Sequence, residues 1–124
     1  MQHEVPVSEE TQLGKVEISP TAIATLAAQA VLQSYGVVGM APSNLADELM
    51  TALGDAAHRG VQVRVDDNQI RIDLYVVVEY GTRISSVAHS IMNVVKYTVE
   101  RALGVPVSQV NVHVQGLRVS NPDV

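Results

Sequence analysis

The sequence contains no cysteine, phenylalanine or tryptophan, and tyrosine, with four residues, is the only large aromatic type present. Without cysteine the chain cannot form a disulfide bond, a thiolate nucleophile or a zinc–thiolate site. Without phenylalanine and tryptophan its core must be aliphatic and rich in valine, which favours strands packed beside helices. A chain of 124 residues has room for one such core.

Basic residues are also scarce, since eight Lys and Arg stand against thirteen Asp and Glu, for a net charge of -5. Binding of nucleic acid through its phosphates needs a clustered basic surface, so we expect no nucleic-acid partner. No apolar run approaches the roughly 20 residues of a membrane span. The first residues are polar and acidic, unlike a signal peptide. We expect a cytoplasmic protein whose membrane contact is made through a partner.

Signatures of catalysis, metal binding and cofactor binding are missing as well. The four histidines, at positions 3, 58, 89 and 113, show no HxH, HxxxH or HExxH spacing, so a metal site is not predicted. Asp73 and His113 could form an acid–base pair on neighbouring strands, but a flat sheet face offers no pocket to shift their pKa values. We therefore expect no enzyme activity, no catalytic residue and no cofactor.

The pattern of apolar residues predicts one compact unit between two tails. We expect a flexible tail over residues 1–12, a single domain over 13–119 and a second tail over 120–124. Within the domain we expect a strand over 14–18, a helix over 21–35, a short strand after Gly36, and a helix after Pro42 that carries Leu45, Leu49 and Leu53.

The second half of the chain gives the clearest signals. Alternating residues predict a β-hairpin over 61–78, with its turn at Asp66 to Gln69. A wide apolar stripe predicts a helix over 84–103, and strict alternation over 110–117, VNVHVQGL, predicts a last strand. Strand, helix and strand in succession favour a crossover between parallel strands. The fold is thus predicted to be α+β, a two-layer sandwich of a small mixed β-sheet with helices packed on one face.

Alternation also predicts a polar face of the sheet, pointing away from the helices. Arginine, tyrosine and amide side chains are well suited to protein–protein contacts. An ordinary solvated face remains open as the other interpretation. An exposed sheet edge would offer a second adhesive surface. The residues predicted to bind a partner are Arg64, Arg71, Asp73, Tyr75, Asn111, His113 and Gln115.

Four blocks of the sequence are distinctive in their order and spacing: LGKVEISPTAIATLAAQAV, YGVVGM, IRIDLYVVVEYG and VSQVNVHVQGL. Together, from about Leu13 to Val119, they resemble the alkaline-shock family of bacterial envelope stress response proteins. The resemblance implies a non-enzymatic protein that supports cell-envelope homeostasis. It also implies that the protein self-associates and lies at the inner face of the membrane through a membrane-anchored partner. The segment APSNLADELMTALGDAAHRG departs from the family's often glycine-rich, basic middle region, which makes direct attraction to anionic lipid less credible.

Two other functions stay open at this point. One is a regulatory subunit that modulates a metabolic enzyme, for example in lipid synthesis. The other is a nucleic-acid binder of the KH type, for which GVVG at Gly36 to Gly39 matches the GXXG loop. Its two middle residues are valines with no nearby lysine or arginine, so a helix end followed by a short strand explains this segment better.

Overall fold

The computed structural model describes residues 8–41, 60–66 and 69–119, which form two helices and two sheets. The elements in chain order are β1 (Ser8–Thr11), β2 (Gly14–Glu17), α1 (Pro20–Leu32), β3 (Val37–Met40), β4 (Val61–Asp66), β5 (Gln69–Glu79), α3 (Ile84–Leu103) and β6 (Gln109–Arg118). The α+β fold predicted from the sequence is confirmed. The helix predicted after Pro42 and the tip of the turn between β4 and β5 lie outside the described residues.

Local chemistry sets the ends of both helices. The Ser19 hydroxyl oxygen accepts a hydrogen bond from the backbone N–H of Ala22 at 3.2 Å, and Pro20 occupies the first turn of α1. Helix α1 ends at Leu32, three residues before the end predicted from the sequence. Helix α3 has the predicted bounds and ends at Gly104, whose left-handed conformation (φ +75°) costs glycine least.

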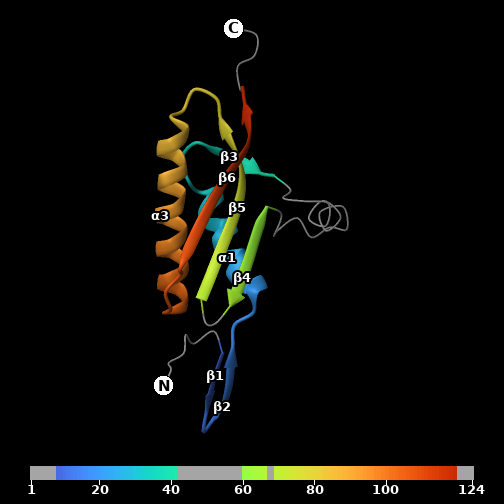
Figure 1. Ribbon diagram of the computed structural model, residues 1–124, viewed down its shortest axis with the longest axis vertical. Coiled ribbons are helices and arrows are strands. Elements are labelled where there is room, and N and C mark those ends of the chain that lie inside the picture. The colour runs from blue at the N-terminus through green and yellow to red at the C-terminus, as the bar shows by residue number, and fades with distance from the viewer. Residues whose placement is uncertain (1–7, 42–59, 67–68, 120–124) are drawn as a thin grey trace.

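Strand β5 is the centre of the main sheet (Figure 1). On one side it pairs in parallel with β6, as the predicted crossover through α3 requires. On the other side it pairs antiparallel with β4 along its first half and with β3 along its second half. The junction lies at Tyr75, whose N–H donates to Gly60 C=O at 2.8 Å and whose C=O accepts from Ala41 N–H at 2.9 Å.

The core lies between this sheet and the two helices. Every second residue of β5 is fully buried, and helix α3 contributes a stripe at helical spacing. The intervening residues of β5 are only partly buried, so α1 and α3 cover one face of the sheet. We call the other side the open face. The buried residues of β5 and α3 are Ile70, Ile72, Leu74, Val76, Val78, Val87, Ile91, Val95 and Val99.

Strands β1 and β2 form a separate hairpin that projects from one end of the molecule, which we call the arm (Figure 1). The sequence predicts Ser8–Thr11 to be part of a flexible tail, whereas the structure places these residues in β1. The hydroxyl of Thr11 fastens the turn, since it accepts from Leu13 N–H at 3.1 Å and donates to Gly14 C=O at 3.0 Å. The strand escaped prediction because an arm exposed on both faces needs no apolar alternation.

Candidate interaction surface

Strand register brings the polar residues of the open face side by side. Across β4 and β5, Arg64 lies opposite Arg71 and Gln62 opposite Asp73. Across β5 and β6, Asp73 lies beside Asn111 and Tyr75 beside His113. Six of the seven predicted partner-binding residues therefore form one continuous surface. The seventh, Gln115, is exposed at the point where the register of β6 shifts by one residue between Val114 and Gly116.

Asp73 is the hub of a small hydrogen-bond network. The same oxygen, Oδ1, accepts from Asn111 Nδ2 at 3.1 Å and lies 3.1 Å from His113 Nε2. Because a carboxylate only accepts, Nε2 is the donor in this contact. The Asp73 side chain is 24% exposed and the His113 side chain 42%. The network fixes three polar side chains at the surface without burying them.

The imidazole of His113 is also held by Tyr75. The two rings stack with their centroids 4.5 Å apart and an angle of 11° between their planes. His113 is thus restrained by a carboxylate at Nε2 and by a ring on its face, which reduces the side-chain entropy that binding would otherwise cost. Such a preorganised polar surface is suited to recognition.

Arg64 and Arg71, directly opposite each other on β4 and β5, give one end of the open face a positive charge. Like charges directly opposite each other on neighbouring strands are destabilising. Asp66 lies 4.0 Å from Arg71, but both side chains are well exposed and an ion pair of this kind contributes little. The two guanidinium groups therefore favour a partner that presents carboxylates.

Sequence reasoning missed a row of small residues at the other end of the open face. Val77 lies between Gly39 of β3 and Gly116 of β6. A Cβ at Gly39 would meet nothing within 4 Å, and at Gly116 only the Val77 methyl groups at 3.9 Å. No side-chain contact therefore requires glycine at either position. Both glycines stand at register shifts of their ladders, and glycine inside a strand marks either such an irregularity or close approach by another molecule. Glycines within predicted strands were the available signal.

Lys96 and Glu100 of α3 form hydrogen bonds to the backbone of Val107, in the segment before β6. We call these contacts the clasp, because they hold the start of β6 in place. Val107 donates its backbone N–H to Glu100 Oε2 at 2.8 Å, and Lys96 Nζ donates to the Val107 carbonyl at 2.8 Å. Lys96 Nζ also lies 3.3 Å from Glu100 Oε2, so the two side chains form an ion pair. The hydrogen bond from Val107 holds the pKa of Glu100 below its ordinary value; burial raises this pKa, and Lys96 lowers it further.

We expect the clasp to give stability its own pH dependence. A lowered pKa stabilises the folded protein above the ordinary glutamate pKa of about 4.3, and this stabilisation is lost as the pH falls through the lowered value. Glu100→Gln should therefore cost about 1–2 kcal/mol at pH 7, and this difference from wild type should shrink below about pH 4. Urea denaturation of both proteins between pH 7 and pH 3 measures it. A difference that stays constant over this range would contradict the assignment.

The described residues hold no group of three or more His, Cys, Asp or Glu that could bind a metal ion.

A groove of about 680 Å³ lies between α1 and α3, and none of its lining residues is charged. It is lined by Thr25, Leu26, Gln29, Ala30, Gln33, Ser34, Tyr35, Ser90, Val94 and Thr98. Asp73 and His113 are not among these residues, so the polar network is separate from this groove. Neither described helix has the length and apolar character needed to cross a membrane.

Comparison with known proteins identifies a family for this chain. Residues 8–119 match the family model of alkaline shock protein 23, described as having a cell envelope-related function. The chain is 46% identical over 114 residues to the uncharacterized protein YloU of Bacillus subtilis, a match that covers 90% of this chain and 95% of YloU.

The name of a second relative refers to the stress response. The chain is 32% identical over 96 residues to a stress response regulator gls24 homolog of Streptococcus pyogenes, covering 77% of this chain and 52% of that protein. Among solved structures, a variant of the MamM CTD in its zinc form matches with a TM-score of 0.50 and 14% identity, over 80% of this chain and 87% of that one. This likeness concerns the fold alone. The family predicted from the sequence is confirmed: the chain belongs to the alkaline shock protein 23 family, whose function is related to the cell envelope.

Proposed function

We propose that this protein is a non-enzymatic interaction module of the envelope stress response. It binds a membrane-anchored protein at the cytoplasmic side of the membrane through its open face, and it associates with further copies of itself. The observation that carries the proposal is the Asp73 network, which orders Asn111 and His113 on a sheet face that the described helices leave uncovered. The family's link to the cell envelope supports the setting.

The chemistry of the open face indicates what the partner presents. Carboxylates suit the Arg64 and Arg71 end, and a close backbone or an apolar side chain suits the row around Val77, where glycines flank a partly buried valine. The network between them offers hydrogen bonds from side chains that are already ordered. A partner segment would therefore run along β5, with its carboxylates beside Arg64 and Arg71.

The test is a double substitution on the open face. Arg71→Glu with His113→Ala reverses one charge and removes the stacked imidazole, while both side chains are partly exposed and contribute no core contact. We expect the variant to fold, with a small loss of stability from the missing hydrogen bond to Asp73 and the missing stack on Tyr75. In bacteria that produce the protein, mild crosslinking followed by mass spectrometry should capture a neighbour with a transmembrane segment, and the variant should lose it at least about tenfold.

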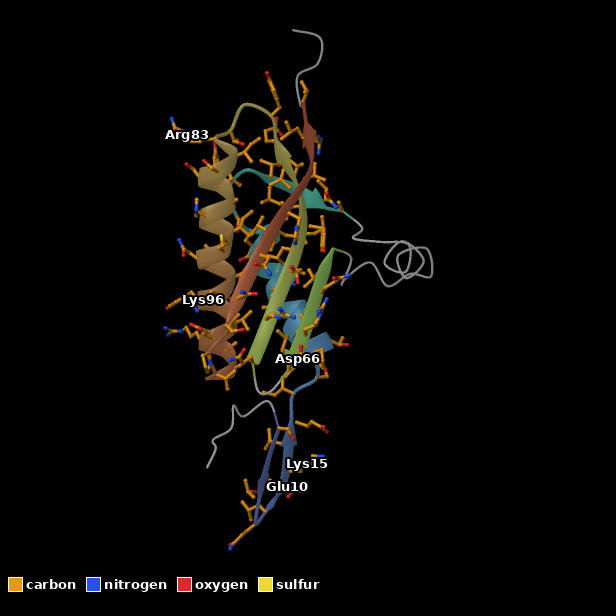
Figure 2. The ribbon with its side chains drawn as sticks, in the orientation of Figure 1. Glu10, Lys15, Asp66, Arg83 and Lys96 are labelled. Atoms are coloured by element: carbon orange, nitrogen blue, oxygen red, sulfur yellow. The ribbon has the colours of Figure 1, made fainter. Side chains whose placement is uncertain are left out.

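A matched control makes the same chemical changes elsewhere. Arg83→Glu with His89→Ala alters two exposed residues at the beginning of α3, away from the sheet, and should leave capture unchanged (Figure 2 labels Arg83). Equal capture by the open-face variant and the wild type would mean that this face is merely solvated. Capture of a soluble metabolic enzyme in place of a membrane protein would favour the regulatory-subunit function instead.

A further inference from the structure

The arm has an outer edge with backbone groups available for pairing. Strand β2 pairs with β1 on one side, and within the described residues no other strand pairs with it. All four residues of β2 are exposed, including Val16 at 52%, and Leu13 at the turn is 100% exposed. A hairpin of two strands is only marginally stable alone in water. The exposed edge and the Val16 side chain are features that a further strand would cover.

The hairpin register shows which residues of β2 face outward. Thr11 and Gly14 flank the two-residue turn, and in such a hairpin the pair next to the turn exchanges backbone hydrogen bonds. Hydrogen-bonded and non-hydrogen-bonded pairs then alternate along an antiparallel ladder. The backbone groups of Gly14 and Val16 therefore point to β1, whereas those of Lys15 and Glu17 point to the outer edge.

Strand β2 is complementary to a second copy of itself. When two β2 strands run antiparallel about a two-fold axis at Val16, each Lys15 lies opposite Glu17 of the second copy, and the two outward residues of each strand exchange backbone hydrogen bonds. Two opposite-charge pairs then form across the axis, and the two Val16 side chains meet. Pairing through β1 is disfavoured because its sequence, SEET, has two acidic residues and no basic one.

The arm's position leaves room for this arrangement. Figure 1 shows the arm projecting along the long axis beyond the main sheet, and Figure 2 shows Glu10 and Lys15 on it, clear of the helices. Neither α1 nor α3 therefore covers the arm. We infer that the arms of two copies join edge to edge through β2, with the two-fold axis at Val16, into a four-stranded antiparallel sheet. The inference rests on the proposed function only for self-association, to which it assigns a surface.

A single introduced cysteine tests the register, because the chain has none of its own. At Val16 the two Cα atoms would lie about 4.5 Å apart as a non-hydrogen-bonded pair, within the range of about 4.4–6.8 Å that disulfides span. Mild oxidation of Val16→Cys should give mainly disulfide-linked dimer on a non-reducing gel. Leu13→Cys is the control, since it is more exposed but would lie about 20 Å from its counterpart. Equal crosslinking of the two variants, or none at Val16, would overturn the inference.

A charge exchange tests the same surface without a covalent bond. Lys15→Glu alone, or Glu17→Lys alone, places like charges opposite each other twice and should lower the dimer fraction in sedimentation several-fold. Each also breaks the ion pair between Lys15 Nζ and Glu17 Oε1 of the same chain, 3.8 Å apart, but this pair is well exposed and contributes little. The double variant Lys15→Glu/Glu17→Lys restores opposite charges and should recover the wild-type fraction. No recovery in the double variant would contradict pairing through β2.

The two proposals fail in different ways. The arm variants should still capture the membrane partner, and the Arg71/His113 variant should still form the Val16→Cys dimer. If sedimentation shows self-association that the arm variants do not alter, pairing through β2 is contradicted while self-association itself stands. If the partner is lost only from the arm variants, partner binding through the open face is contradicted.

Discussion

Replacing Gly60 with alanine should lower the free energy of unfolding by about 2–4 kcal/mol. Gly60 has φ +80°, a left-handed conformation that other residues adopt at a cost. A Cβ there would lie 2.6 Å from the Ala41 carbonyl oxygen and 2.9 Å from that of Tyr75. Tyr75 lies within β5, and Ala41 directly follows β3 with its N–H bonded to Tyr75, so neither carbonyl can move aside without disturbing the junction of β3, β4 and β5.

Chemical denaturation measures the effect, with Gly39→Ala as the control. Gly39 lies in β3, its φ is not positive, and a Cβ there would meet nothing within 4 Å. Its substitution should change stability by less than about 0.5 kcal/mol. A Gly60→Ala protein as stable as Gly39→Ala would contradict the described junction. Because the junction is built on the backbone of Tyr75, Gly60→Ala should also weaken capture of the partner by the open face.

Leu74→Ala should be comparably costly, at about 3–4 kcal/mol. Leu74 is fully buried at the centre of β5, between Val61 of β4 and Val112 of β6. Truncation removes apolar burial and leaves a cavity that neighbours paired on both sides fill poorly. Leu13→Ala makes the same chemical change at a fully exposed position and should be nearly neutral. Similar midpoints for the two variants in urea would show that β5 is not the centre of the core.

Helices α1 and α3 and the central strand could be predicted because their burial leaves a period in the sequence. The α3 stripe recurs at helical spacing, so its bounds and its burial both followed. In β5 the sequence alternates only as far as Leu74 and is then continuously apolar to Val78, although every second residue is buried along the whole strand. Strand β1 could not be predicted, since its described side chains are exposed and no period marks them. The sharing of one side of β5 by β3 and β4 was also invisible, because it depends on pairs that are distant in sequence, such as Val37 with Val78 and Met40 with Val76.

The candidate surface was predicted as a set of residues but not as a network. Alternation placed Asp73, Asn111 and His113 on one face, but only the parallel register of β5 and β6 brings both donors to one carboxylate oxygen. The register shift that separates Gln115 from them is a backbone irregularity with no counterpart in side-chain pattern. The clasp around Val107 was missed for a similar reason, since it joins a helix to a loop through backbone atoms.

Ala41 and Gly60 are both hydrogen-bonded to the backbone of Tyr75. The chain leaves the sheet and returns to it at neighbouring points, one bonded to the carbonyl and the other to the amide of the same residue. Because Tyr75 fixes both points, their separation is set by the sheet and not by the number of residues that join Ala41 to Gly60. A change in that number should therefore leave the pairing of β3, β4 and β5 intact.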